Sequence, residues 1–245
     1  ITYTTAGLPD METTKKIMFA QQEAGIDVME LGIPFSDPVA DGPVIQAASY
    51  EAIQKGATLT KIFTLMKEVR KEGLTTPVVF MMYYNTVYHY GLEEFVEMCA
   101  DCGVDGLIIP DLPYEEQKEI NAVLAENEAA PILIQLVSPV SKQRIPMIVN
   151  NARGFVYCVS QMGVTGNGAN FHKQIREYLL EVKKNSPVPV MMGFGIRTAG
   201  DVEPLEDIID GAIVGSHFIT LMKENNYDEN VIKEYISSFK KEMNE

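Results

Sequence analysis

The chain has 245 residues, 46% of them hydrophobic, which is enough apolar material for one sizeable core. Its formal net charge is −14 at pH 7. Nucleic acids and anionic membranes need a basic footprint on the protein, so this charge argues against both as partners. A phosphate ligand would have to be held by local backbone N–H groups or by a local cation, against the overall field.

Cysteine and histidine usage argues against metal and disulfide chemistry. The cysteines are Cys99, Cys102 and Cys158, and the histidines are His89, His172 and His217. An odd number of cysteines in a chain of this length favours reduced thiols and a cytoplasmic location. Cys99 and Cys102 have the C-x-x-C spacing of a redox or metal pair, but a helix end closed by Gly103 is the simpler interpretation. We expect no metal site, no membrane-spanning helix and no secretory leader.

Short apolar runs alternate with amphipathic stretches almost throughout the chain, which predicts strands alternating with helices. In chain order, the predicted strands span residues 1–6, 28–31, 77–83, 106–109, 131–137, 155–159, 188–192 and 212–214. The predicted helices span residues 11–24, 44–55, 59–72, 92–102, 114–126, 142–150, 171–184, 201–207, 216–224 and 230–242. Asp10 is the expected N-cap of the first helix. Extra helices are therefore expected in the loops after the second and eighth strands.

Eight strand–helix units in one unbroken alternation imply parallel strands joined by right-handed crossovers. Their natural closure is an α/β fold of the (β/α)8, or TIM, barrel type. The alternative is a doubly wound open sheet, which usually opens with a glycine-rich turn after its first strand. The turn at residues 6–9, AGLP, is no dinucleotide-binding fingerprint. No linker or low-complexity tract divides the chain, so we predict a single domain over residues 1–245.

The active site of such a barrel lies at the C-terminal ends of the strands, and this rule selects candidate residues. They are Glu30, Asp41, Tyr83, Asn85, Pro110, Asp111, Tyr157 and the segments 163–166, 193–195 and 215–216. Glu30 is flanked by apolar residues, and a carboxyl group inside a closed barrel would be poorly solvated. Its pKa should rise toward neutrality, as a group that both gives and takes a proton requires. The simpler alternative is a solvated acid at a strand end, and Asp37 and Asp41 could likewise be solvated loop residues.

The glycine pairs after the seventh and eighth strands predict a phosphate site. Glycines let the backbone approach an anion closely, and Gly215 and Ser216 open a predicted helix whose N-terminus adds partial positive charge. The loops after strands seven and eight are the usual phosphate site of this fold. The alternative is that these glycines serve only as turn residues. Aromatic and methionine side chains near the strand ends mostly predict packing, although some could wall a flat apolar ligand.

The segment 29–42, MELGIPFSDPVADG, resembles residue for residue the signature of the tryptophan synthase alpha-subunit family. Further motifs fall in family order at residues 5–9, 83–85, 111–113, 163–166, 193–195 and 215–216. The resemblance implies cleavage of indole-3-glycerol phosphate to indole and glyceraldehyde 3-phosphate without a cofactor. It also implies pairing with a PLP-dependent beta subunit, expected as an alpha2beta2 heterotetramer, for tryptophan biosynthesis.

The resemblance also implies a role for each matching residue. Glu30 becomes the general acid/base, Asp41 the partner of the indole N–H, and Tyr157 a residue that positions the substrate and Glu30. The implied substrate-binding residues are Tyr3, Met81, Ile108, Thr165 and Phe194. The implied phosphate-binding residues are Gly166, Gly195, Gly215 and Ser216. The loop at 34–38 would face the beta subunit, and the loop at 163–170 would close over the substrate.

Three features depart from the family pattern. The family usually begins with a helix before the first strand, and we expect that helix to be absent here. Gln161 and Met162 stand where some members have Arg and Ser, and His217 stands where a small residue is common. Three other functions stay open: a stand-alone indole-releasing lyase, a catalytically quiet activating subunit, and another phosphate-binding barrel such as a sugar-phosphate isomerase or epimerase.

Overall fold

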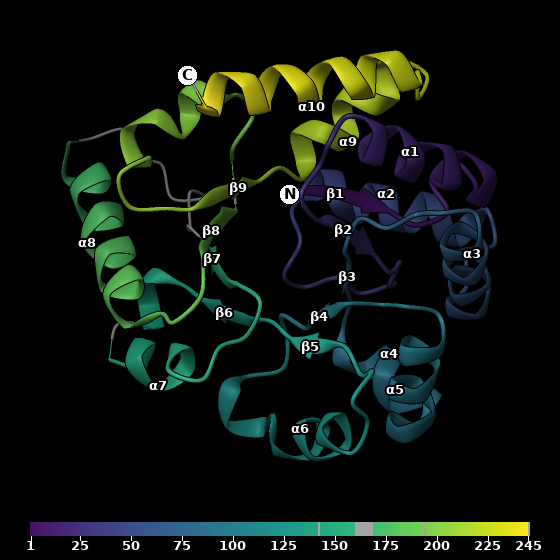
Figure 1. Cartoon of the computed structure of the whole chain (residues 1–245), viewed down its shortest axis with the longest axis horizontal. Helices are drawn as coiled ribbons and strands as arrows, with labels where there is room; N and C mark the ends of the chain where they lie inside the picture. The colour runs from purple at the N-terminus through teal and green to yellow at the C-terminus, as the bar shows by residue number, and fades with distance from the viewer. Residues whose placement is uncertain (142, 160–168, 194, 245) are drawn as a thin grey trace.

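In the computed structural model, parallel strands surround the middle of the molecule and helices lie outside them (Figure 1). The structure describes residues 1–141, 143–159, 169–193 and 195–244. The strands are β1 (Thr2–Thr5), β2 (Met29–Gly32), β3 (Val78–Met81), β4 (Gly106–Ile108), β5 (Ile132–Leu133), β6 (Gln135–Val137), β7 (Val156–Val159), β8 (Val190–Gly193) and β9 (Gly211–Ile213). All pairings between them are parallel.

The helices follow the strands around the outside of the barrel. They are α1 (Met11–Glu23), α2 (Pro43–Gln54), α3 (Leu59–Lys71), α4 (Tyr84–Tyr90), α5 (Leu92–Asp101), α6 (Lys118–Ala125), α7 (Ile145–Val149), α8 (Ala169–Asn185), α9 (Ser216–Glu224) and α10 (Glu229–Asn244). Short 3-10 helices in the described part of the chain join them, namely η1 (Tyr114–Glu116), η2 (Pro139–Ser141), η3 (Ala199–Asp201) and η4 (Glu203–Leu205). Two helices follow β2 and two follow β9. No helix in the described part of the chain is long and apolar enough to cross a membrane.

Backbone hydrogen bonds close the barrel although the strands form two sheets, β1 to β5 and β6 to β9. Ile134 is the one residue between β5 and β6, and its N–H donates to the carbonyl oxygen of Leu107 at 2.9 Å. The two segments are therefore parts of one continuous strand of the barrel. At the other junction, the N–H of Tyr3 donates to the carbonyl oxygen of Val214 at 2.9 Å. β5 and β6 together are thus the single predicted strand 131–137, and the barrel they belong to has eight strand positions. The alternative of an open sheet is wrong.

The barrel interior combines bulky side chains with glycines. Its buried core is formed by Val79, Ile108, Ile134, Phe155 and Ile213. A Cβ atom on Gly32 would lie 2.0 Å from the Tyr3 hydroxyl oxygen, and one on Gly193 would lie 2.5 Å from the Tyr157 ring. Glycine at the last position of β2 and of β8 therefore leaves room for two tyrosine rings, because both rings occupy the volume a larger residue would need.

Some helices differ from their predicted extents for local reasons. Asp10 caps α1 as predicted, accepting from the N–H of Thr13 at 2.7 Å. The predicted helix at 201–207 is instead the pair η3 and η4, because Pro204 has no N–H with which to continue a helical ladder. Helix α4 was not predicted. The N–H of its first residue, Tyr84, donates to the Asp111 carboxylate at 2.9 Å, a contact that only the folded barrel brings about.

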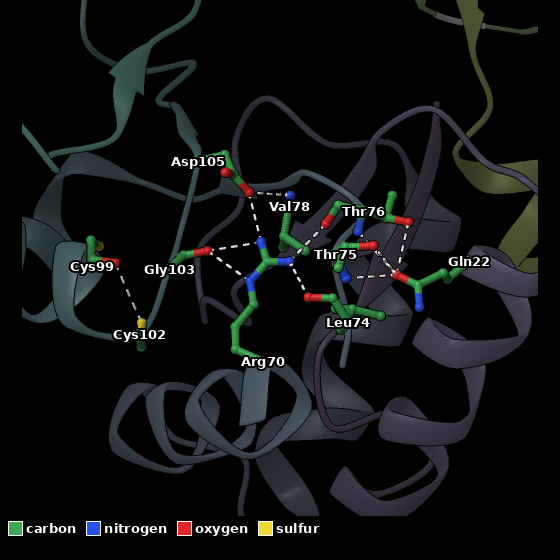
Figure 2. Close-up of polar contacts among 10 residues, drawn as sticks. All are labelled: Gln22, Arg70, Leu74, Thr75, Thr76, Val78, Cys99, Cys102, Gly103 and Asp105. Atoms are coloured by element: carbon green, nitrogen blue, oxygen red, sulfur yellow. Dashed lines mark hydrogen bonds and ion pairs between the residues drawn. The ribbon is translucent and has the colours of Figure 1, made fainter. Parts of the chain in front are cut away.

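The N-terminal ends of β3 and β4 are joined by Arg70 from α3, as Figure 2 shows. Its guanidinium donates to the carbonyl oxygens of Gly103, Leu74 and Thr76 at 2.8 to 3.0 Å. It also pairs with the Asp105 carboxylate at 2.7 Å. All these partners lie at the end of the barrel opposite the expected active site. This charge is satisfied by the scaffold, which indicates a role in stability.

Cys99 and Cys102 lie beside this network and are both buried (Figure 2). The Cys102 thiol donates to the Cys99 carbonyl oxygen at 3.6 Å. Gly103 follows with φ +70°, and its N–H donates to the carbonyl oxygen of Ala100, so glycine closes α5 as predicted. Burial raises the pKa of the Cys102 thiol to about 11, which leaves it protonated at neutral pH. Within the described residues, no cluster of His, Cys, Asp and Glu could hold a metal ion.

Candidate active site

Glu30 lies on β2 with its side chain inside the barrel and is only 2% exposed. Its Oε2 atom is buried without a hydrogen-bond partner. Burial, assisted by the negative charge of Asp41, raises the pKa of Glu30 from 4.5 to about 8. The predicted rise of this pKa toward neutrality is confirmed, and the alternative of a solvated acid at a strand end is wrong. At neutral pH the carboxyl group can both donate and accept a proton.

Asp41 is held in place at the end of the loop that follows β2. The Tyr83 hydroxyl donates to Asp41 Oδ2 at 2.9 Å and accepts from the N–H of Ala40 at 3.0 Å. Phe35 stacks on the Tyr83 ring with centroids 5.0 Å apart. Burial raises the pKa of Asp41, and the Tyr83 hydrogen bond opposes that rise. Asp41 is therefore not a freely solvated loop residue, whereas Asp37 in the same loop is exposed.

The sequence alone placed Tyr83 at a strand end but did not connect it to Asp41. The two residues are separated by 42 positions, and their contact depends on how far the loop after β2 folds back across the end of β3. Tyr83 is buried, so its hydroxyl needs an internal partner, and the Asp41 carboxylate provides one. The sequence feature that could have indicated this contact was a tyrosine at a predicted strand end together with a nearby acidic loop.

Two further tyrosines lie close enough to Glu30 to interact with its charge, and Thr5 lies two residues after one of them on β1. Burial raises the pKa of both Tyr3 and Tyr157, and the charges of Glu30 and Asp41 add to the rise for each. Among the described residues, two buried side-chain oxygens lack a hydrogen-bond partner, namely Glu30 Oε2 and Thr5 Oγ1. Unpartnered buried oxygens are costly unless a ligand or water satisfies them. Thr5 belongs to a motif noted in the sequence but was not predicted as a site residue.

Apolar side chains complete the wall beside Glu30. Met81 and Ile108 end β3 and β4, are paired in the sheet register, and point into the barrel. Together with Tyr3 they present the kind of surface that a planar aromatic ring needs. Thr165, Gly166 and Phe194 lie outside the described residues, as does most of the predicted closing loop at 163–170.

A candidate anion subsite adjoins this pocket. Gly195 follows β8 with φ +74°, and Gly215 is the N-cap of α9, whose first residue is Ser216. The first N–H groups of a helix have no intrahelical acceptor and carry partial positive charge. A Cβ atom on Gly215 would lie 3.7 Å from Ile45 and 3.8 Å from Tyr3. The candidate anion subsite and the wall of the Glu30 pocket are therefore in direct contact.

The barrel mouth thus combines a proton-transfer carboxyl, a second carboxylate held by a tyrosine, an apolar wall and a helix N-terminus. Glu30 can act as an acid or a base, Asp41 can face a developing positive charge, and Gly215 and Ser216 can offer N–H groups to an anion. Such a set suits a reaction on a substrate with an apolar part at one end and a phosphate at the other.

Comparison with known proteins gives a consistent result. Residues 1–245 match the family model described as tryptophan synthase alpha chain. The chain is 75% identical over 244 residues to the tryptophan synthase alpha chain of Lachnospira eligens, covering 100% of this chain and 92% of the relative. It is 45% identical over 244 residues to that of Thermoanaerobacter sp. (strain X514), covering 98% of this chain and 92% of the relative.

Solved structures agree with the sequence comparisons. The tryptophan synthase subunit alpha from Legionella pneumophila str. Paris superimposes with a TM-score of 0.88 at 32% identity, covering 99% of this chain and 91% of that chain. A chain of the tryptophan synthase complex from Pyrococcus furiosus superimposes with a TM-score of 0.85 at 31% identity, covering 98% of this chain and 96% of that chain.

Proposed function

The chain belongs to the tryptophan synthase alpha chain family, and we propose that it is the lyase subunit that cleaves indole-3-glycerol phosphate to indole and glyceraldehyde 3-phosphate. The observation that carries this assignment at the level of chemistry is Glu30, buried and unpartnered with a pKa of about 8. Breaking a carbon–carbon bond to an aromatic ring requires prior protonation of the ring carbon. A carboxyl group that is partly protonated at neutral pH meets that requirement.

Glu30 acts twice in one turnover. Protonated Glu30 first donates its proton to the indole ring carbon that bears the glycerol side chain, which leaves a positive charge delocalised to the ring nitrogen. The resulting carboxylate then takes the proton of the adjacent glycerol hydroxyl. The O–H electron pair forms the aldehyde C=O bond, the carbon–carbon bond breaks, and its electrons restore the aromatic ring. Glu30 ends protonated, so the step is balanced without a cofactor.

Asp41 stabilises the intermediate charge. It would accept a hydrogen bond from the indole N–H while the ring is positively charged, in a site with little water. The Tyr83 hydroxyl fixes the Asp41 carboxylate before the substrate arrives, so little reorganisation is needed. Tyr157, which lies in the field of both carboxylates, would position the substrate against Glu30.

Backbone N–H groups would hold the phosphate. Gly195, Gly215 and Ser216 are the described members of this set, and Gly166 is the proposed fourth. The net charge of −14 opposes an anionic substrate at long range, so the attraction has to be local. A helix N-terminus provides such a local field without a lysine or arginine.

The partner of the chain is the tryptophan synthase beta subunit. A related alpha chain from Pyrococcus furiosus was solved in the tryptophan synthase complex, with 96% of that chain covered here. The loop after β2 carries Phe35 and the 82% exposed Val39, an apolar surface suited to burial against another subunit. We place this interface beside Asp41 and the assembly in the cytoplasm, where the three buried cysteines would stay reduced.

The test is indole release from indole-3-glycerol phosphate, measured with the chain alone and then with a tryptophan synthase beta subunit. Slow release that rises strongly with the partner supports the two-component enzyme. Fast release by the chain alone favours the stand-alone lyase. No release under either condition from a folded chain contradicts the proposal and leaves the quiet subunit or a different phosphate substrate.

A further inference from the structure

The Tyr235 side chain of helix α10 reaches the loop that follows β8. Its hydroxyl donates to the carbonyl oxygen of Arg197 at 2.8 Å. Arg197 lies two residues after Gly195. On the other side of the same residue, the N–H of Arg197 donates to the Asp201 carboxylate at 2.9 Å. Two hydrogen bonds therefore hold the backbone of this loop at Arg197.

The same Tyr235 also contacts the first turn of α9. Its ring centroid lies 5.6 Å from that of His217 and 5.7 Å from that of Phe218. His217 directly follows Gly215 and Ser216, the other half of the candidate anion subsite. One side chain of α10 thus touches both strand-end loops, and it does so from outside the barrel.

We propose that Tyr235 is a positioning residue that sets the spacing between the Gly195 loop and the first turn of α9, and through that spacing the affinity for a phosphate group. This inference rests on the proposed function only in placing a phosphate between these two loops. Backbone N–H groups bind an anion well only within a narrow range of distance and angle. A small displacement of one loop would weaken binding although no residue that touches the ligand has changed.

Two substitutions separate the hydroxyl from the ring. Tyr235→Phe removes the hydrogen bond to Arg197 and keeps the ring against His217, whereas Tyr235→Leu removes both contacts. The loss of one hydrogen bond typically corresponds to a change of about 3- to 10-fold in an equilibrium constant, and this is the largest rise in phosphate Kd that we expect for Tyr235→Phe, because the bond already exists without phosphate. Tyr235→Leu should weaken binding further.

The measurements are calorimetric titrations with inorganic phosphate and with glycerol 3-phosphate, and steady-state kinetics on indole-3-glycerol phosphate with the beta subunit present. KM should rise by about the same factor as the phosphate Kd, while kcat stays within about twofold. Tyr178→Phe is the matched control. The Tyr178 hydroxyl also donates to a backbone carbonyl oxygen, that of Val137 at 2.7 Å, and among the described residues no hydrogen bond or ring contact joins Tyr178 to the Gly195 loop or to the first turn of α9. The control should leave the phosphate Kd unchanged.

Several results would overturn the inference. They are an unchanged phosphate Kd in both Tyr235 variants, an equal weakening in the Tyr178 control, a fall in kcat at constant KM, and a wild-type chain that binds neither phosphate probe. A wild-type chain that binds phosphate but releases no indole would contradict the proposed function instead. The titrations would still decide the role of Tyr235 in that case.

Discussion

Ionisation of the buried Glu30 carboxyl group costs folding free energy, and a single substitution can measure that cost. The pKa of Glu30 rises from 4.5 to about 8 on folding, chiefly because the carboxyl group is buried. A group whose folded pKa is raised contributes most to stability below its unfolded pKa, and this contribution is lost as the pH rises through the folded pKa. Glu30 therefore destabilises the fold progressively between about pH 4.5 and pH 8.

The size of this effect follows from the two pKa values. Linkage gives a penalty of about 1 kcal/mol at pH 5.5 and roughly 4 to 5 kcal/mol at pH 8.5, relative to strongly acidic pH. Glu30→Gln removes this penalty but buries an amide, which adds a cost of about 1–3 kcal/mol that does not vary with pH. The stability of the variant relative to wild type should thus improve by about 3 kcal/mol between pH 5.5 and 8.5.

Urea denaturation of both proteins at the two pH values provides the test, with the midpoint and the slope fitted separately. Glu97→Gln on α5 is the matched control, because the Glu97 side chain is exposed and its carboxylate stays in water before and after folding. The control should follow the wild-type pH dependence. Parallel stability curves for wild type and Glu30→Gln would refute the burial argument and the acid/base role derived from it.

Three substitutions test the site itself. Glu30→Gln should also retain substrate binding and lose most of its turnover, because an amide cannot shuttle protons; substantial indole release by this variant would remove Glu30 from the mechanism. Gly215→Val should weaken the binding of phosphate-bearing ligands in a titration, since its branches would enter the space next to Ile45 and crowd the proposed anion subsite. Tyr83→Phe should lower kcat/KM by about 10-fold, by releasing one hydrogen bond to the Asp41 carboxylate. It should leave the affinity for inorganic phosphate unchanged, and a fall in that affinity would show that Tyr83 supports the whole pocket instead.

Local patterns in the sequence were sufficient to predict the fold and the burial of Glu30. Alternation of apolar runs with amphipathic stretches predicts parallel strands, because each strand–helix unit must bury one face against the next unit. Asp10 as an N-cap and Gly103 as a helix end follow from contacts within a few residues. Glu30 was predictable because an acid among apolar neighbours on an inward face has nowhere to be solvated.

Contacts between distant residues were decided only by the tertiary structure. The sequence does not show that Tyr83 would hold Asp41, that Asp111 would bind the first N–H of α4, or that Tyr235 would contact both the loop after β8 and the first turn of α9. It also does not show that Thr5 Oγ1 would be buried without a partner. Periodicity and capping depend on neighbours along the chain, whereas these contacts depend on how closely the closed barrel brings separate loops together.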